Sequence, residues 1–305
     1  MKSLEIDRIS KRYGEHLALD SLSFTVPPGE IFGFVGSNGA GKTTTLRIAV
    51  GVLSADDGTV RWGDGPVTRQ GAARFGYMPA ERGLYPKMTV AKQLVYLGRL
   101  HGMPASEAHS AMLRWTERLH IAQYRDKTVD ALSLGNQQRV QLAASLVHDP
   151  DLLILDEPFS GLDPLGVDDM SAVLKEKAAQ GAPVLFSSHQ LELVESLCDR
   201  IGVVRGGQLV ARGTLEELRS SHGATQLYLH VEGAAPDWPA CSPAIAAFTP
   251  EEDGVLVQPA PGCTENEVLR AAMDHGVVRQ MAWRRPTLTR MFRDLVEPQA
   301  GRTAA

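Results

Sequence analysis

The chain has 305 residues, of which 43% are hydrophobic and 22% are charged, a composition typical of a soluble globular protein with a sizeable core. Its formal net charge of -5 argues against a broad nucleic-acid-binding face, so no nucleic-acid partner is expected. The N-terminus lacks the apolar segment of a secretory signal, and no apolar run reaches the roughly 18 residues needed to span a bilayer, so any membrane role is expected to act through a partner.

The N-terminal part of the chain predicts short strands separated by turns. Apolar runs of this kind occur at 4–10, 22–26, 31–36, 58–62 and 74–78. A helix is expected after Gly41. From 89 to 148 the pattern is helical, and the spacing of Met112, Trp115 and Leu119 predicts that Trp115 lies in the core.

Two further apolar runs, at 151–156 and 183–188, predict buried strands on either side of a helix that begins after Pro164. The composition then shifts around 220–223, where a domain boundary is expected. The first domain is therefore predicted to cover 1–220.

The remainder combines the alternating run LYLHV, a proline-rich middle, the helix-like ENEVLRAAM and an amphipathic TLTRMFRDLV. This mixture predicts a small α+β accessory domain over 224–297. It carries no phosphate loop and no clustered acids, so no catalytic residue is expected there. The tail at 298–305 is predicted to be disordered.

A glycine-rich loop, GSNGAGKTT at 36–44, matches the pattern G-x-x-x-x-G-K-[ST], follows a predicted strand and opens a helix. Glycines let backbone N–H groups turn toward phosphates, and the helix N-terminus adds partial positive charge. Lys42 is expected to reach the β- and γ-phosphates, and the Thr43 hydroxyl to bind Mg²⁺. The residues expected to contact the nucleotide are Gly36, Ser37, Asn38, Gly39, Ala40, Gly41, Lys42, Thr43 and Thr44.

Two acids end the first of the later buried strands, in the segment LLILDEP. Asp156 is expected to hold Mg²⁺ through water, and Glu157 to act as the general base for a water that attacks the γ-phosphate. His189 follows the run at 183–188. A histidine at a strand end can hydrogen-bond a γ-phosphate, and a purely structural rim histidine satisfies the same local pattern.

Together these motifs resemble the nucleotide-binding subunit of ATP-binding cassette (ABC) transporters, over about residues 4–220. The loop at 36–44 is similar to the Walker A motif of that family, and Asp156 with Glu157 to its Walker B motif and catalytic glutamate. By the same resemblance His189 is the switch histidine, SGLDP at 160–164 is the D-loop, and Tyr13 is the aromatic that stacks on adenine.

The resemblance implies an α/β fold of the P-loop NTPase type. It predicts a RecA-like core, an antiparallel β subdomain and a helical subdomain at about 89–148, followed by the small C-terminal α+β domain. The implied activity is ATP hydrolysis with Mg²⁺, in which Lys42, Glu157 and His189 are the catalytic residues.

The segment LSLGNQ at 132–137 is similar to the family signature LSGGQ, with Ser133 and Gly135 at the serine and second glycine positions. In the family, two cassettes enclose two ATP molecules head to tail. The resemblance therefore implies a dimer in which Ser133 and Gly135 of one cassette contact the ATP held by the other. Because this chain keeps both halves of such a site, a homodimer is expected, and a heterodimer stays open. Leu134 and Asn136 depart from the signature, and we expect the clamp to keep working with altered affinity.

A second departure lies in the segment FGYMPAERGLYPKMTV, which resembles the family loop between the core and the helical subdomain. The family places Gln, or in some branches Glu, where this chain has Ala80, and Glu81 follows. A methyl group cannot bind Mg²⁺ or orient water. Either Glu81 takes over this role or the coupling of ATP to the partner differs.

Three segments, ERGLYPKMTV, LSLGNQQR and PTLTRMFRDLV, resemble the exporter cassettes grouped with drug and sodium export, whose membrane subunit is a separate chain. The implied function is ATP hydrolysis that powers a separate polytopic permease from the cytoplasmic face of the membrane.

Two alternatives stay open. A non-hydrolysing regulatory cassette is suggested by Ala80 and the altered signature, and opposed by intact Lys42, Glu157 and His189. A soluble ABC ATPase acting on nucleic acid or the ribosome is opposed by the single cassette, the lack of cysteine clusters and the negative charge.

Overall fold

The computed structural model describes residues 2–72, 74–81, 83–222, 225–251 and 253–296. The chain forms two compact units, Met1–Leu215 with Leu295–Ala305, and Glu216–Asp294. The predicted disordered tail at 298–305 lies outside the described residues. Within the described ranges, no helix is both long enough and apolar enough to cross a membrane.

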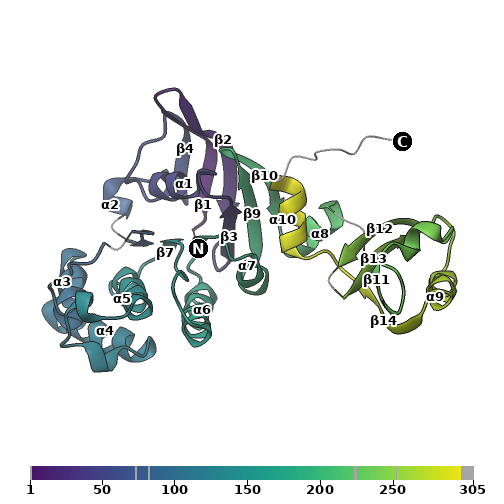
Figure 1. The fold of residues 1–305 in the computed structure, drawn as a ribbon. Coiled ribbons are helices and arrows are strands. Elements are labelled where there is room, and N and C mark those ends of the chain that lie inside the picture. Colours follow the sequence, from purple (N-terminus) through teal and green to yellow (C-terminus); the bar gives the residue numbers. More distant parts are fainter. Residues whose placement is uncertain (1, 73, 82, 223–224, 252, 297–305) are drawn as a thin grey trace. The chain divides into compact units, whose positions relative to one another are not determined.

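A six-stranded sheet forms the centre of the first unit, in the order β10-β9-β3-β8-β7-β6. Figure 1 labels β3, β7, β9 and β10 of this sheet. All neighbouring strands are parallel except β9 and β10. Every residue of β3, β7 and β8 is buried, because a parallel sheet is covered on both faces. The strands are β3 (Ile31–Gly36), β6 (Phe75–Met78), β7 (Leu152–Asp156), β8 (Val184–Ser188), β9 (Arg200–Arg205) and β10 (Gln208–Gly213).

A second, antiparallel sheet packs against this centre, in the order β2-β1-β4-β5. Phe24 joins the two layers, since its ring stacks on Phe32 at 4.9 Å and on Phe34 at 5.2 Å between centroids. These aromatic residues belong to the main hydrophobic core. The strands are β1 (Leu4–Tyr13), β2 (His16–Val26), β4 (Asp57–Trp62) and β5 (Gly65–Pro66).

Helices complete the first unit. The helical stretch predicted at 89–148 contains α3 (Val90–Leu100), α4 (Ala105–Arg118) and α5 (Leu134–Leu146), with short 3-10 turns at Ala122–Tyr124 and Val129–Ala131 (Figure 1). Trp115 is 5% exposed, so its predicted place in the core is confirmed. The other helices are α1 (Lys42–Ala49), α2 (Arg69–Ala72), α6 (Pro164–Ala179) and α7 (Leu191–Leu197).

The second unit is an antiparallel sheet with one helix packed on its apolar face, as the predicted α+β class requires. The strand order is β12-β13-β11-β14, and α9 contributes Val268 to a core that includes Leu227 and Val257. A capping box formed by Thr264 and Glu267 begins α9. Its elements are β11 (Gln226–Glu232), β12 (Ile245–Glu251), β13 (Gly254–Pro259), α9 (Glu265–Met273) and β14 (Val277–Arg284), with a 3-10 turn at Trp238–Cys241. In the sequence, the chain passes from one unit to the other after Leu215 and after Asp294, within helices α8 (Leu215–His222) and α10 (Leu288–Val296).

Candidate functional site

The glycine-rich loop connects β3 to α1, as predicted. Gly39 and Gly41 have φ values of +79° and +104°, a backbone region that side chains rarely adopt. A Cβ at Gly41 would also lie 2.6 Å from Leu19 Cδ2 and 2.8 Å from the Ala18 carbonyl. Gly41 is the N-cap of α1 and offers no side chain to its first turn. The N–H groups there are therefore available to an anion.

Lys42 is the first residue of α1, and its side chain lies under the loop. The residue is 7% exposed, and Nζ donates to the Gly36 carbonyl at 2.7 Å and to the Ser37 carbonyl at 3.2 Å. The same nitrogen is 4.0 Å from Glu157 Oε1. Burial lowers the pKa of Lys42, and the negative charges of Glu157 and Asp156 oppose that shift. The site thus holds a buried cation against nearby carboxylates.

Asp156 ends β7 and is 1% exposed. Its Oδ1 accepts a hydrogen bond from Ser187 Oγ at 2.5 Å, whereas Oδ2 is buried without a hydrogen-bond partner among the described residues. A buried carboxylate oxygen without a partner is costly unless it binds a cation. The arrangement therefore suits Mg²⁺, which prefers such oxygen ligands and keeps several of its waters.

Glu157 follows directly and has a φ of +50°, which turns its side chain out of the strand direction. Its N–H donates to Ser187 Oγ at 3.0 Å. Its carboxylate Oε2 lies 2.8 Å from His189 Nδ1, at hydrogen-bonding distance. Parallel pairing of β7 with β8 brings these groups together, because Asp156 is in register with Ser187. Lys42, Asp156, Glu157 and His189 therefore form one cluster.

Ser187 was missed by the sequence prediction. Its hydroxyl donates to Asp156 and accepts from Glu157, so it fixes both acids at once. The sequence feature that could have indicated Ser187 is the pair of serines at the end of the otherwise apolar run PVLFSS. Finding its role required the pairing of β7 with β8, which the local pattern does not give.

The other residues predicted to contact the nucleotide lie on the loop, in the first turn of α1 and at the end of β1. Ser37, Asn38 and Gly39 are exposed at the loop tip, and Thr43 and Thr44 are half-buried in the first turn of α1. Ala40 is buried at 3%. Tyr13 ends β1 with half of its surface exposed, and Lys11 Nζ lies 5.9 Å from its ring centroid. An exposed aromatic ring of this kind is available for stacking.

Ser133 and Gly135 lie at the start of α5. Ser133 is the N-cap, and its Oγ accepts from Asn136 N at 3.5 Å. A Cβ at Gly135 would lie 3.4 Å from the Gly161 carbonyl, so the helix start is close to the D-loop. Leu134 between them is 55% exposed. Among the described residues, no hydrogen bond or ion pair joins Ser133 to the cluster of Lys42 and Glu157 in the same chain.

Glu81 does not lie among the buried acids. Its Oε1 is 3.1 Å from Arg47 Nη2 in the last turn of α1, and its side chain is 84% exposed. Ala80 beside it is exposed as well. The geometry thus favours the second of the two sequence interpretations, in which Glu81 has not replaced the missing glutamine and coupling to the partner differs.

Replacing Glu81 by alanine is expected to change ATP turnover by less than about fivefold, because an exposed ion pair contributes only about 0.2–1 kcal/mol. Ala80→Gln is expected to raise turnover, since it restores a group able to orient water. Phosphate release from the two purified variants and the wild type measures both effects. A loss of more than about tenfold in Glu81→Ala would contradict this assignment.

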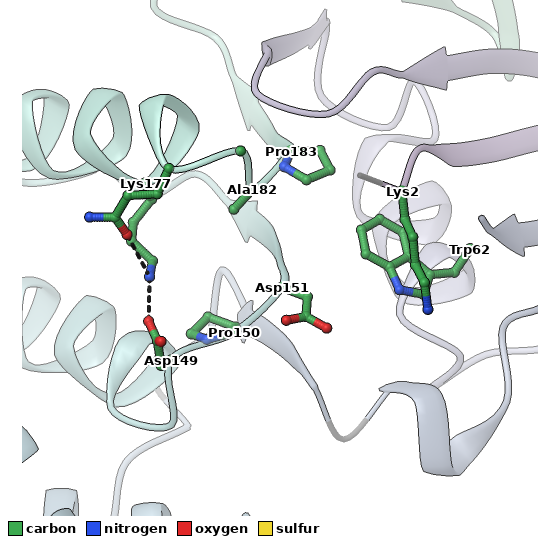
Figure 2. Close-up of a pocket in the computed structure, with 10 residues that line it drawn as sticks. Lys2, Trp62, Asp149, Pro150, Asp151, Lys177, Ala182 and Pro183 are labelled. Carbon is green, nitrogen blue, oxygen red and sulfur yellow. Dashed lines mark hydrogen bonds and ion pairs between the residues drawn. The ribbon is translucent and has the colours of Figure 1, made fainter.

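A separate cavity of about 460 Å³ lies at the opposite edge of the central sheet (Figure 2). Its lining residues Asp151 and Pro183 precede β7 and β8, whereas Asp156 and His189 lie at or beyond the ends of these strands. Lys177 beside it donates to Asp149 at 2.6 Å. None of the predicted site residues lines this cavity, so it is not part of the cluster described above.

Sequence comparisons agree with this geometry. Residues 19–160 match the family model for ABC transporters, and residues 213–296 match the model described as ATP-binding protein DrrA1-3-like, C-terminal domain. The uncharacterized ABC transporter ATP-binding protein YhaQ of Bacillus subtilis is 39% identical over 289 residues, covering 95% of this chain and 97% of that protein.

Two relatives have names that refer to export or resistance. The Nod factor export ATP-binding protein I of Paraburkholderia xenovorans is 39% identical to this chain. The alignment covers 72% of this chain and 73% of that protein. The linearmycin resistance ATP-binding protein LnrL of Bacillus subtilis is 34% identical, and the alignment covers 75% of this chain and 75% of that protein.

Among solved structures, an ATP-binding subunit of an ABC transporter aligns with a TM-score of 0.67 at 28% identity, covering 72% of this chain and 92% of that chain. The predicted fold class is confirmed by this likeness. Taken with the relatives, it shows that the chain belongs to the ATP-binding proteins of ABC transporters, a family of cassettes that bind and hydrolyse ATP.

Proposed function

We propose that this chain is the ATP-hydrolysing subunit of an exporter and drives a separate polytopic membrane permease from the cytoplasmic face of the membrane. The observation that carries the proposal is the cluster of Lys42, Asp156, Glu157 and His189 at the carboxyl ends of parallel strands. The names of the relatives linked to Nod factor export and linearmycin resistance support the direction of transport.

In this proposal the phosphates of ATP lie on the loop at 36–44. Backbone N–H groups at the start of α1 and the Lys42 ammonium bind the phosphates, which requires Lys42 Nζ to exchange loop carbonyls for phosphate oxygens. Thr43 and Asp156 would hold Mg²⁺, which would neutralise negative charge on the phosphates. Tyr13 stacks on the adenine.

Glu157 accepts the proton of the attacking water. Its carboxylate is held by His189, and its backbone is fixed by Ser187, so the base is oriented before the substrate binds. His189 is 59% exposed and therefore also free to contact the γ-phosphate. This division of tasks makes Glu157 the base, with Lys42 and His189 as the groups that stabilise the transferred phosphoryl charge.

The proposed permease contact is a groove of about 560 Å³ between the core and the helical subdomain. The end of α1, strand β6 and helices α3 and α5 line it, with Val52, Phe75 and Leu97 among the apolar side chains. Val52 is 69% exposed, and nearby Leu100 is 62% exposed. Exposed apolar surface beside a groove is typical of a protein contact. We therefore assign it to a segment of the permease.

The permease proposal is tested by purifying the tagged chain from membranes of its own cells. A polytopic membrane protein should copurify, and replacing Val52 by glutamate should remove it while ATP binding persists. Replacing the exposed Val277 of the second unit by glutamate controls for a general effect of added charge. Recovery of the chain without any membrane protein under mild detergent would contradict the proposal.

We also propose that the cassette is a homodimer with two composite sites, each completed by Ser133 and Gly135 of the other copy. Ser133 and Leu134 at the start of α5 are exposed, and among the described residues no hydrogen bond or ion pair joins Ser133 to the cluster of its own chain. A helix N-terminus with exposed residues can bind a phosphate held by a second copy.

A mixture of two variants tests this arrangement. Lys42→Ala removes the phosphate cradle, and Ser133→Arg places bulk where the γ-phosphate should lie. Neither homodimer should form with ATP in a Glu157→Gln background, which blocks turnover. The mixed dimer has one intact composite site, so ATP-dependent association followed by light scattering should return. A Ser133→Arg homodimer that still associates with ATP would exclude a role of Ser133 across the interface.

Finally, we assign all nucleotide chemistry to the domain predicted at 1–220 and an accessory role to that at 224–297. Within the described residues, all clustered acids and phosphate-loop glycines named above lie in the first unit. The second unit has its own hydrophobic core, which includes Leu229 and Val257.

A further inference from the structure

Two glutamines on helix α5 make hydrogen bonds that leave the helical subdomain. Gln138 and Gln141 are three residues apart, so they lie on the same side of the helix. They are 9% and 4% exposed. Buried amide side chains are rarely placed without a partner, and each of these donates to two backbone carbonyls.

The carbonyls belong to two different loops of the core. Gln138 Nε2 donates to the carbonyls of Glu157 at 3.1 Å and Pro158 at 2.8 Å. Gln141 Nε2 donates to the carbonyls of Pro79 at 2.6 Å and Glu81 at 3.2 Å. A single helix therefore holds both the turn that carries the general base and the loop that leads from β6 to α3.

The loop at 79–81 is also attached to the phosphate-binding helix. The Glu81 carboxylate pairs with Arg47 in the last turn of α1, while the Glu81 carbonyl accepts from Gln141. The ion pair is exposed and screened by solvent, whereas the amide of Gln141 is buried. The attachment to α5 is therefore the stronger of the two.

We propose that Gln141 is a positioning residue that makes the loop at 79–81 move with helix α5. Helix α5 begins at Leu134, with Ser133 as its N-cap. A displacement of this end, where the proposed phosphate contact lies, is transmitted to the loop through the buried amide. Gln141 also lines the groove between the core and the helical subdomain, which places this link beside the proposed permease contact. The inference rests on the proposed nucleotide site.

The link explains how this chain works with Ala80 in place of a polar side chain. A methyl group at position 80 makes no hydrogen bond to the nucleotide site, so the loop cannot respond through that side chain. The backbone of the same loop is instead held from α5. The response to ATP then passes through carbonyl groups, whose position does not depend on the identity of residue 80.

The experiment compares Gln141→Glu and Gln141→Met in the full chain. Glutamate keeps the shape but has no N–H donor and places an anion against two carbonyls, and methionine keeps the volume without any polar group. Gln123→Glu is the matched control, because the Gln123 amide donates to the His120 carbonyl within the helical subdomain. ATP affinity, kcat and amide hydrogen exchange with and without ATP are measured.

We expect kcat to fall at least about tenfold in Gln141→Glu and less in Gln141→Met, while the Kd for ATP changes by less than about threefold. The ATP affinity is kept because the phosphate loop is intact. In the wild type, ATP should protect the amides of both 36–44 and 75–81. In the variants the protection of 75–81 should be lost and that of 36–44 kept.

Gln123→Glu should behave as the wild type. A folded Gln141→Glu with the kcat and exchange pattern of the wild type would overturn the proposal. So would parallel losses of affinity and kcat with faster exchange throughout the chain, which indicate a general structural role. If Gln141→Glu does not fold, Gln141→Met decides by the same criteria. A wild type that does not bind ATP would refute the proposed nucleotide site itself.

Discussion

Glu157→Gln is expected to lower ATP turnover by about 10²- to 10⁴-fold while ATP still binds. The amide keeps the shape of the carboxylate, but it cannot accept a proton from the attacking water. The residue is fixed on three sides, by Ser187 at its N–H, by Gln138 at its carbonyl and by His189 at its carboxylate. Two of these contacts use the backbone, so the substitution leaves the turn in place.

Phosphate release and ATP affinity have to be measured separately to test this result. Binding should persist or tighten, because the substitution removes a negative charge close to the phosphates. Glu192→Gln on α7 makes the same chemical change at an exposed position and should leave both ATP turnover and ATP affinity unchanged. Substantial turnover in Glu157→Gln would show that another group activates the water.

Lys42→Ala is expected to weaken ATP binding by about 10- to 100-fold, the range for losing one buried hydrogen bond to a charged group. The ammonium already lies under the phosphate loop, held by two carbonyls and 4.0 Å from Glu157 Oε1. Removing it leaves the carboxylates of Asp156 and Glu157 facing the phosphates without a compensating cation. Electrostatic repulsion then adds to the lost contact.

Titration calorimetry with ATP and Mg²⁺ measures the affinity of the Lys42→Ala variant. Lys92→Ala on α3 removes an exposed lysine and serves as the matched control. The thermal stability of Lys42→Ala should stay close to that of the wild type, since the two loop carbonyls regain contact with water. An unchanged affinity for ATP would mean that the phosphates do not lie on this loop.

The local sequence was sufficient to single out the residues that form the central cluster, because each part has its own pattern. The phosphate loop is a motif with fixed spacing between a strand and a helix, and Asp156 follows a fully buried strand. Parallel strands place their carboxyl ends at one edge of the sheet, so these separate signals converge without further information.

Contacts that depend on tertiary packing could not be predicted. Ser187 is an ordinary serine until β8 pairs with β7 and brings its hydroxyl between two acids. Gln138 and Gln141 have the local pattern of polar helix residues, and only packing of α5 against the core shows which carbonyls they reach. Glu81 was one candidate for a nucleotide contact, but its position beside Arg47 depends on where α1 ends.

We propose that two copies of this chain enclose ATP and hydrolyse it. The mass of the Glu157→Gln variant in solution tests this most directly, measured by light scattering at saturating ATP together with the number of bound nucleotides. We expect a species of twice the mass of one chain with two ATP molecules, which dissociates when ATP is removed. A variant that stays a single chain with ATP bound would contradict it.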